Sequence, residues 1–232
     1  MKRLGLLFLV LVACRKPAAV PARPLLESVR SEARAGKSAA LVVIHGLGGN
    51  ERNLFSLGRA VAPDAVVIGL RAPIVRGPDS FSWFPVEFTP RGPVHDIAAA
   101  EASRVRIVEF VRARKSDPAI DAERITLLGF SQGAILSEAI ALTEPGLIDG
   151  AVLISGRTLP ELKAVAGAKK RPRVLVLHGT RDAVLPYENG VTTNEVLASG
   201  GYEVEFKSFD AAHEVTEPMV EAMRAWLSRS AR

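Results

Sequence analysis

A serine flanked by glycines has the clearest chemical potential in this sequence of 232 residues. Gly129-Phe130-Ser131-Gln132-Gly133 forms a complete G-x-S-x-G motif, and it stands between an apolar run and a helix-forming stretch. A strand that turns sharply into a helix holds its serine at a strained apex, where side chains at the two glycine positions would collide with the backbone. The motif predicts that Ser131 is a nucleophile. The alternative is a tight turn with a bystander serine.

A serine hydroxyl needs a general base, and that base must be held in one tautomer by a carboxylate. After a G-x-S-x-G serine, the partners follow in the order Asp or Glu, then His. Downstream of Ser131 the sequence has His178 and His213. His178 falls at the tip of an apolar run and is interpreted as structural, whereas His213 follows the last predicted strand. His213 is therefore the predicted base.

Two aspartates compete for the role of the carboxylate. Asp182 follows the apolar run 174–178, in a loop that also holds Pro186. Asp210 stands three residues before His213, where it is expected to shape the turn. Ligands of open parallel sheets bind outside the carboxyl ends of the strands. Asp182, just after a strand, is therefore the predicted carboxylate.

A second glycine-rich segment, His45-Gly46-Leu47-Gly48-Gly49, closes the first long apolar run. Its glycines allow backbone N–H groups to point into a cleft, where they can hold the oxyanion of a tetrahedral intermediate. The predicted donors are the N–H groups of Leu47 and Gln132. His45 is interpreted as a residue packed beneath this loop. The alternative, a metal ligand, lacks a second His or Cys at ligand spacing, so no metal site is predicted.

These residues are attached to a regular alternation of strand-like and helix-like segments. Apolar runs typical of strands buried on both faces occupy 40–45, 65–70, 125–129, 150–155 and 174–178, with a more alternating strand at 203–209. Helical stretches occupy 51–61, 97–115, 132–142, 159–166, 189–198 and 217–228, and a further short helix is predicted over 25–35. The alternation predicts the α/β class, with a mostly parallel central sheet and helices on both faces.

One connection, 71–93, is too long for a routine loop and is rich in proline and aromatic residues. Its rings are those of Phe81, Trp83, Phe84 and Phe88. In one interpretation these rings fill the domain core. In the other they form an apolar wall or lid over the site, and Trp83 and Phe84 are then predicted to contact the substrate.

Residues 1–13 have the features of a secretory signal peptide. Met1-Lys2-Arg3 is positively charged, and the apolar stretch 4–12 is shorter than the roughly 20 residues that span a bilayer. Leu11-Val12-Ala13-Cys14 resembles the bacterial lipobox, in which the cysteine becomes lipid-modified. We expect lipid attachment at Cys14, a proline-rich tether over 14–24, a catalytic domain over 25–232 and a place in the bacterial cell envelope. The alternative is a plain secretory signal with Cys14 incidental.

The composition is that of an ordinary globular domain, with 48% hydrophobic and 24% charged residues. Without Lys2 and Arg3, 28 basic residues remain against 25 acidic residues, a net charge of +3. A charge this small, without any RNA- or DNA-binding motif, predicts no nucleic-acid partner.

Together these segments resemble the phospholipase/carboxylesterase family, which includes the acyl-protein thioesterases. The resemblance rests on His45-Gly46-Leu47-Gly48, Arg71-Ala72-Pro73, Ser82-Trp83-Phe84, the serine motif, His178-Gly179-Thr180-Arg181-Asp182 and His213. It implies the α/β-hydrolase fold and a serine esterase or thioesterase that needs no cofactor. It also implies the triad Ser131, Asp182 and His213, with oxyanion donors at Leu47 and Gln132. One departure is Pro85, where the family often has an aspartate.

We therefore expect a hydrolase that cleaves small-molecule carboxylic esters or thioesters through an acyl-enzyme, with a preference for short to medium uncharged acyl chains. Two alternatives stay open. The chain could be a hydrolase-fold binding module that no longer turns over, because a fold does not imply an activity. It could also act on peptide bonds or on acyl groups linked to polysaccharides.

Overall fold

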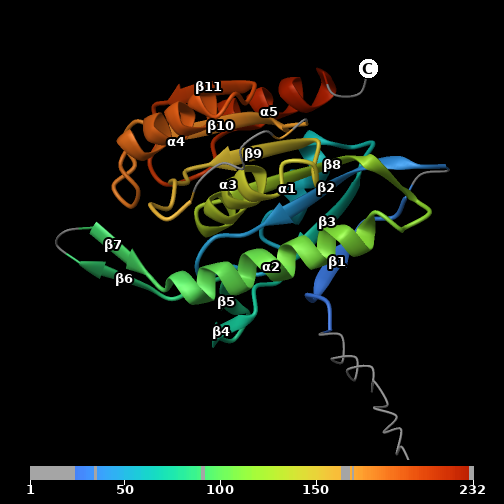
Figure 1. Cartoon of the computed structure of the whole chain (residues 1–232), viewed down its shortest axis with the longest axis horizontal. Helices are drawn as coiled ribbons and strands as arrows, with labels where there is room; N and C mark the ends of the chain where they lie inside the picture. The colour runs from blue at the N-terminus through green and yellow to red at the C-terminus, as the bar shows by residue number, and fades with distance from the viewer. Residues whose placement is uncertain (1–23, 34–35, 90–91, 163–167, 169, 230–232) are drawn as a thin grey trace, which may run out of the picture.

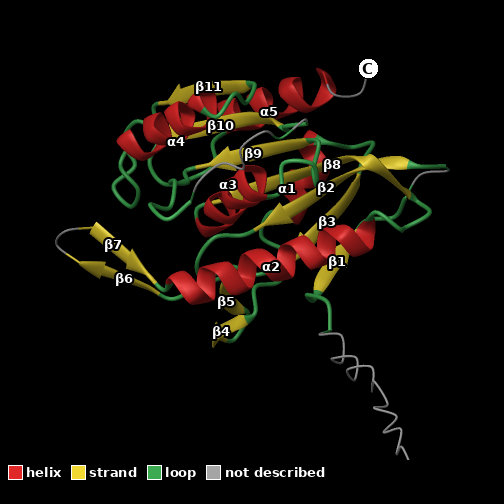
Figure 2. Ribbon diagram, viewed as in Figure 1, coloured by secondary structure: helices red, strands yellow, loops and turns green. Residues whose placement is uncertain are grey.

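A seven-stranded sheet forms the centre of the protein (Figures 1 and 2). The computed structural model describes residues 24–33, 36–89, 92–162, 168 and 170–229. The strands lie in the order β1-β3-β2-β8-β9-β10-β11, and all pairs are parallel except β1 with β3. Their bounds are Ser28–Arg30 (β1), Ser38–Ile44 (β2), Val66–Leu70 (β3), Ile120–Phe130 (β8), Gly150–Ile154 (β9), Arg173–Gly179 (β10) and Val204–Phe209 (β11). This arrangement confirms the predicted α/β class.

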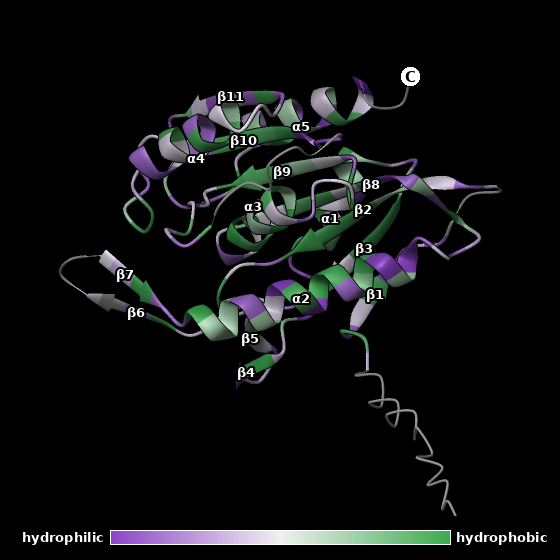
Figure 3. Cartoon of the chain, in the orientation of Figure 1, coloured by the Kyte–Doolittle hydropathy of each residue, from purple (hydrophilic) through white to green (hydrophobic). Residues whose placement is uncertain are grey.

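Helices cover both faces of the sheet. They are Phe55–Val61 (α1), Ile97–Arg114 (α2), Gln132–Thr143 (α3), Glu188–Ser199 (α4) and Glu217–Arg229 (α5). Buried residues of α2, α3 and α4 share one apolar cluster with the sheet, while those of α1 and α5 belong to a second cluster. In Figure 3 the central strands are mostly coloured as hydrophobic, whereas α2 carries hydrophilic segments along its length.

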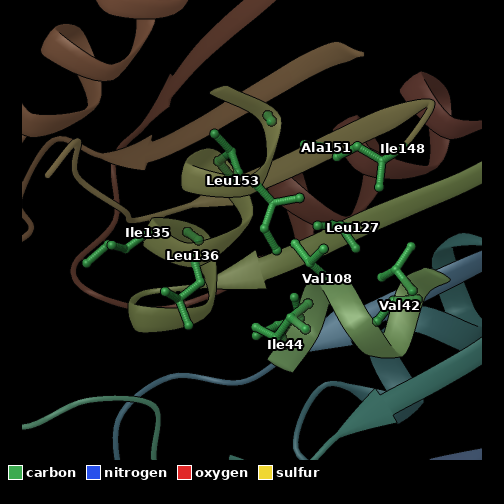
Figure 4. Packing of buried hydrophobic residues seen from close by; sticks show 14 of the residues in the cluster. Val42, Ile44, Val108, Leu127, Ile135, Leu136, Ile148, Ala151 and Leu153 are labelled. Atoms are coloured by element: carbon green, nitrogen blue, oxygen red, sulfur yellow. The ribbon is translucent and has the colours of Figure 1, made fainter. Parts of the chain in front are cut away.

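The alternation of side chains along each strand explains the two clusters. In β2, Val42 and Ile44 belong to the cluster that includes α2 and α3, and Leu41 and Val43 belong to the other. Successive side chains of a strand point to opposite faces, so a strand buried on both faces must be apolar throughout. Figure 4 shows the first cluster, where strand residues such as Leu127 lie among residues of α2 and α3.

The long connection 71–93 is built from two antiparallel hairpins. Ile74–Gly77 (β4) pairs with Ser80–Ser82 (β5), and Val86–Thr89 (β6) pairs with Gly92–His95 (β7). The β6–β7 hairpin projects beyond the start of α2 (Figure 1). Strands of only three or four residues, with most prolines of the segment between them, give little periodic signal, which is why the sequence suggested only a loop.

Two expected helices are not found as predicted. The helix over 25–35 is wrong, because Ser28–Arg30 forms β1 and pairs with Gly69 and its neighbours at the edge of the sheet. The pairing satisfies backbone groups of β3 that would otherwise form an open edge. In the predicted helix 159–166, residues 160 and 161 form a turn, and 163–167 lie outside the described residues.

The signal peptide over 1–13, the lipidation residue Cys14 and all but the last residue of the tether over 14–24 lie outside the described residues. Within the described part of the chain, no helix is long and apolar enough to cross a membrane.

Candidate active site

Ser131 occupies a sharp turn between β8 and α3. Its backbone has φ 53° and ψ −117°, a left-handed conformation that is rare for a residue with a side chain. The Ser131 N–H donates to the Ile154 carbonyl of β9 at 2.9 Å, which holds the turn against the neighbouring strand. Strain of this kind persists only where the surroundings impose it, and it is typical of a functional site.

The two glycines of the motif are required by close backbone contacts. A Cβ atom at Gly129 would lie 2.2 Å from the Gly133 carbonyl oxygen. A Cβ atom at Gly133 would lie 1.9 Å from the Ile44 carbonyl oxygen at the end of β2. The strand, the turn and the helix can therefore pack this tightly only with glycine at both positions.

His213 and Asp182 form the hydrogen-bonded pair that the sequence predicted. Their Nδ1 and Oδ2 atoms lie 2.7 Å apart, and the Asp182 carboxylate is fully buried. The other carboxylate oxygen accepts from the N–H groups of Val184 and Leu185, at 2.9 and 2.8 Å. The aspartate is thus fixed from one side and presents its second oxygen to the imidazole.

The rival residues lie where a structural role is expected. His178 is fully buried, with Nε2 2.8 Å from the Leu185 carbonyl oxygen, so it supports the loop that carries Asp182. Asp210 is exposed and forms an ion pair with Arg181. Neither side chain forms a hydrogen bond or ion pair with His213 among the described residues, although His178 Nε2 lies 3.5 Å from Asp182 Oδ2.

The loop after β2 lies directly against the nucleophile. A Cβ atom at Gly46 would be 3.2 Å from the Ser131 Cβ atom, so the glycine permits the close approach. Leu47 follows, and both Leu47 and Gln132 line the same cavity as Ser131. The two glycines that follow Leu47 pair with Phe81 of β5. The Gly48 N–H donates to the Phe81 carbonyl at 2.8 Å, and the Phe81 N–H donates to the Gly49 carbonyl at 2.9 Å.

His45 lies beneath this loop, where the sequence placed it. The Ala72 N–H donates to His45 Nε2 at 3.1 Å, so that nitrogen carries no proton, and Nδ1 donates to the Gly46 carbonyl at 2.7 Å. Burial lowers the pKa of His45, which keeps the ring neutral in this arrangement. No group of three or more His, Cys, Asp or Glu residues in the described chain could hold a metal ion.

The side chain of Gln132 has a role that the sequence did not indicate. Its Oε1 atom accepts from the Trp83 N–H at 3.0 Å, and its Nε2 donates to the Phe84 carbonyl at 2.8 Å. The residue after the nucleophile therefore clamps the connection between β5 and β6. Its place inside the serine motif was the only signal available.

The cavity at the site has a volume of about 200 Å³. Ser131, Gln132, His213 and Arg157 are the polar residues that line it, and the apolar ones are Leu47, Phe84, Val86, Pro93, Phe130, Ile135, Val184 and Leu185. Phe84 is among them, and its contact with the substrate stays a prediction. The β6–β7 hairpin contributes Val86 and Pro93, so the long connection forms part of the cavity wall.

The expected contact between Trp83 and the substrate is wrong, because Trp83 does not line the cavity. Its side chain is fully buried, its Nε1–H donates to the His45 carbonyl at 2.9 Å, and its ring packs on the His45 ring. For Trp83 the first of the two interpretations, a ring that fills the core, is the correct one. Trp83 supports the glycine-rich loop from below.

Arg157 is a cavity residue that the sequence analysis missed. It follows β9, and its guanidinium approaches His95, a residue to which no role was assigned. No periodic or motif signal marks this loop. Only the topology, which brings the end of β9 beside that of β8, could have suggested it.

Comparison with known proteins gives a consistent set of matches. The model of the phospholipase/carboxylesterase family matches residues 27–231. Over 172 residues the chain is 30% identical to the esterase YpfH of Escherichia coli, covering 71% of this chain and 70% of that one. It is 29% identical over 119 residues to acyl-protein thioesterase 1 of Gibberella zeae, covering 49% and 51% of the two chains.

Among solved structures, a carboxylesterase from Mesorhizobium loti superposes with a TM-score of 0.73 at 25% identity. The match covers 83% of this chain and 90% of that one.

Proposed function

Because the chain belongs to the phospholipase/carboxylesterase family, we propose that it hydrolyses carboxylic esters and thioesters with Ser131 as nucleophile, His213 as base and Asp182 as the orienting acid. The observation that carries the proposal is the 2.7 Å contact between His213 Nδ1 and Asp182, in a loop that brings His213 to the same cavity as the strained Ser131. The relatives named esterase and thioesterase support both kinds of acyl substrate.

The first half-reaction forms the acyl-enzyme. His213 Nε2 takes the proton of the Ser131 hydroxyl as Oγ attacks the substrate carbonyl, and the C=O bond opens to an oxyanion. The N–H groups of Leu47 and Gln132 stabilise that oxyanion, aided by the N-terminal end of α3. The intermediate collapses, the bond to the alcohol or thiol breaks, and His213 gives its proton to the leaving group.

The second half-reaction repeats these steps with water. His213 removes a proton from the water as its oxygen attacks the acyl-enzyme carbonyl, and the same two N–H groups hold the new oxyanion. The bond to Ser131 Oγ then breaks, and His213 returns the proton to the serine. The products are the carboxylic acid and the free enzyme, and no cofactor takes part.

The cavity supports a preference for short to medium acyl groups. A cavity of about 150 Å³ holds benzene, so about 200 Å³ admits an acyl group of roughly six to eight non-hydrogen atoms. Each buried methylene contributes about 0.8 kcal/mol, so catalytic efficiency should climb over the first few carbons and then level off.

A fluorophosphonate probe tests the chemistry directly. The wild-type protein should be labelled at Ser131 and should release p-nitrophenol from short p-nitrophenyl esters. Ser131→Ala should lose labelling and at least about 10⁴-fold in turnover while unfolding at the same urea concentration as the wild type. An unlabelled, well-folded wild type would instead favour the alternative, a binding module that no longer turns over.

We also propose that the enzyme is exported and tethered to a membrane through lipid on Cys14. The support is the sequence pattern alone: a basic start, a short apolar stretch and Leu11-Val12-Ala13-Cys14. Several acyl chains on one cysteine would give stable anchoring. Cys14→Ser should move the protein out of the membrane fraction. A wild type that fractionates as a soluble protein with Met1 intact would contradict the anchor.

A further inference from the structure

Arg157 lies in the wall of the active-site cavity. It comes three residues after the end of β9, and its side chain is partly buried. It is the only permanently charged side chain among the described residues that line the cavity, and eight of the others are apolar. A single cation in a mostly apolar wall requires a physical reason.

A chain of contacts holds the guanidinium in place. Its Nη2 atom lies 3.1 Å from His95 Nδ1, and His95 Nε2 lies 2.8 Å from a carboxylate oxygen of Glu161. Arginine can only donate, so His95 Nδ1 accepts and the ring proton sits on Nε2, facing Glu161. The His95 ring in turn contacts Phe84, which places Arg157 on the side of the cavity formed by Phe84 and the β6–β7 hairpin.

No carboxylate neutralises Arg157 directly. Its only hydrogen-bond partner among the described residues is the neutral His95, and the residues outside them include no Asp or Glu. Burial lowers the pKa of Arg157, although a guanidinium stays protonated at neutral pH. The cation is therefore partly desolvated and has no hydrogen-bonded carboxylate, although Glu161, on the far side of His95, raises its pKa through its charge.

Two other partly buried arginines, Arg71 and Arg104, are built differently. Arg71 donates to both carboxylate oxygens of Glu51, at 2.7 and 2.8 Å, and Arg104 does the same with Glu101. Such two-pronged pairs are the usual way to neutralise a guanidinium. Arg157 differs in that its guanidinium, at the edge of the catalytic cavity, has no hydrogen-bonded carboxylate among the described residues.

We propose that Arg157 binds a carboxylate of the substrate, so that the preferred substrates are esters or thioesters with a free carboxylate a few bonds from the scissile carbonyl. The inference rests on the proposed function of the site. A carboxylate matches the single guanidinium in charge and in its two-oxygen edge, and it fits a cavity of about 200 Å³. This proposal replaces the expectation, drawn from the sequence, that the preferred acyl group is uncharged.

Shape-matched substrates test the inference. Monoethyl glutarate and ethyl 5-methylhexanoate differ in having a carboxylate or an isopropyl group at the same position, and acid release can be followed by titration. We expect a higher kcat/KM for the anionic ester in the wild type, mainly through a lower KM. In Arg157→Gln the ratio of the two kcat/KM values should fall roughly ten- to hundredfold, the usual range for a hydrogen bond to a charged group.

The control is Arg112→Gln. Arg112 is exposed on α2 and paired with Glu144, away from the cavity, so this variant loses the same charge and should keep the wild-type ratio. Arg157→Lys keeps the positive charge but loses the planar guanidinium that can bind two oxygens at once. Its ratio of kcat/KM values should lie between those of the wild type and Arg157→Gln. Glutarate should also inhibit hydrolysis of the neutral ester in the wild type and inhibit it much less in Arg157→Gln.

A second pair of esters shows which part of the substrate carries the charge. The butanoyl ester of 3-hydroxypropanoate and 3-methylbutyl butanoate place the carboxylate or isopropyl group on the alcohol. An effect of Arg157 on the first pair assigns the carboxylate to the acyl group, and an effect on the second assigns it to the leaving group. Either result supports the inference.

Two results would overturn it. One is a ratio of kcat/KM values, anionic over neutral ester, that in Arg157→Gln stays within about twofold of the wild-type ratio for both pairs of esters. This holds whether or not total activity falls. The other, which needs no variant to fold, is a wild type that prefers the neutral ester of each pair. Either result together with fluorophosphonate labelling of Ser131 would remove only the carboxylate site. Absent labelling, with no hydrolysis of any ester, would remove the proposed function itself.

Discussion

Asp182 uses each of its carboxylate oxygens for a different purpose. One accepts two N–H groups from the loop that follows it, and the other faces His213. Three donors on a buried carboxylate satisfy most of its hydrogen-bonding capacity, so the aspartate is fixed in one orientation. This network is what an orienting acid requires and what exposed Asp210 lacks.

Replacing Asp182 by asparagine should therefore affect catalysis far more than folding. The amide can still accept from the Val184 and Leu185 N–H groups, but it no longer stabilises a protonated His213 or selects its tautomer. We expect kcat on a short p-nitrophenyl ester to fall by about 10³- to 10⁴-fold. Asp210→Asn should stay near wild-type activity. The reverse ranking of the two variants would assign the acid to Asp210.

At the residue scale, the members of the triad could be predicted from the sequence, but the residues of the cavity wall could not. Ser131, Asp182 and His213 each follow a predicted strand, and their order along the chain narrows the choice. Arg157 also follows a strand, but arginine in a loop is so common that its type carries no signal. Trp83 was misplaced because an aromatic ring in a long connection can face either the core or the cleft.

At the scale of elements, the connection between β5 and β6 determines how the glycine-rich loop is held. Trp83 supports this loop from below, and the Gln132 side chain bonds the backbone on both sides of the Trp83–Phe84 peptide. Ser103 of α2 adds a hydrogen bond to the Trp83 carbonyl. The oxyanion loop, the nucleophile helix and the aromatic connection therefore behave as one unit.

Removing the Gln132 clamp should loosen that unit. Gln132→Leu keeps the size of the side chain but leaves a buried N–H and a buried carbonyl without partners, which costs about 1–3 kcal/mol of unfolding free energy. Urea unfolding measures the loss. Ser199→Ala removes an exposed hydrogen bond to the Val196 carbonyl and should change stability by less than about 0.5 kcal/mol. Equal stability of Gln132→Leu and wild type would show that the clamp contributes nothing.

The elements themselves were predicted with uneven success, for physical reasons. The buried parallel strands are continuous apolar runs, and the helices between them are long enough to show their own pattern. β1 was mistaken for a helix because three residues at a sheet edge have no period of their own. Its conformation is set by the partner strand β3, which no local pattern reveals.

At the scale of the whole molecule, the parallel sheet is what brings distant residues to one cavity. Leu47, Ser131, Arg157, Asp182 and His213 follow β2, β8, β9, β10 and β11, in the order in which these five strands lie side by side. The carboxyl ends of parallel strands meet at one edge, so the topology alone collects these side chains. Strand alternation in the sequence predicted this edge, but it could not predict which side chains turn into the cavity.

The stability of the whole protein should depend on a buried carboxyl group beneath this edge. Glu138 of α3 is fully buried, and its hydrogen-bond partners among the described residues are the hydroxyl groups of Thr158 and Thr193. Burial, the dominant cause, raises the pKa of Glu138 to about 7, although the two hydroxyl groups lower it. The folded protein therefore binds this proton more tightly than the unfolded chain does.

The sign of the pH effect follows from that difference. Below the ordinary glutamate pKa of 4.5, Glu138 is protonated in both states and has no pH-dependent effect. As the pH rises to about 7, the unfolded chain ionises first, and the protein loses up to about 3 kcal/mol of stability. Glu138→Gln, which stays neutral, should unfold at a higher urea concentration than the wild type at pH 8, and the gain should shrink toward pH 4.5. Glu221 is exposed, and Glu221→Gln should show no such trend. If Glu138→Gln gained the same stability at every pH, the difference from the wild type would come from packing and not from ionisation of Glu138.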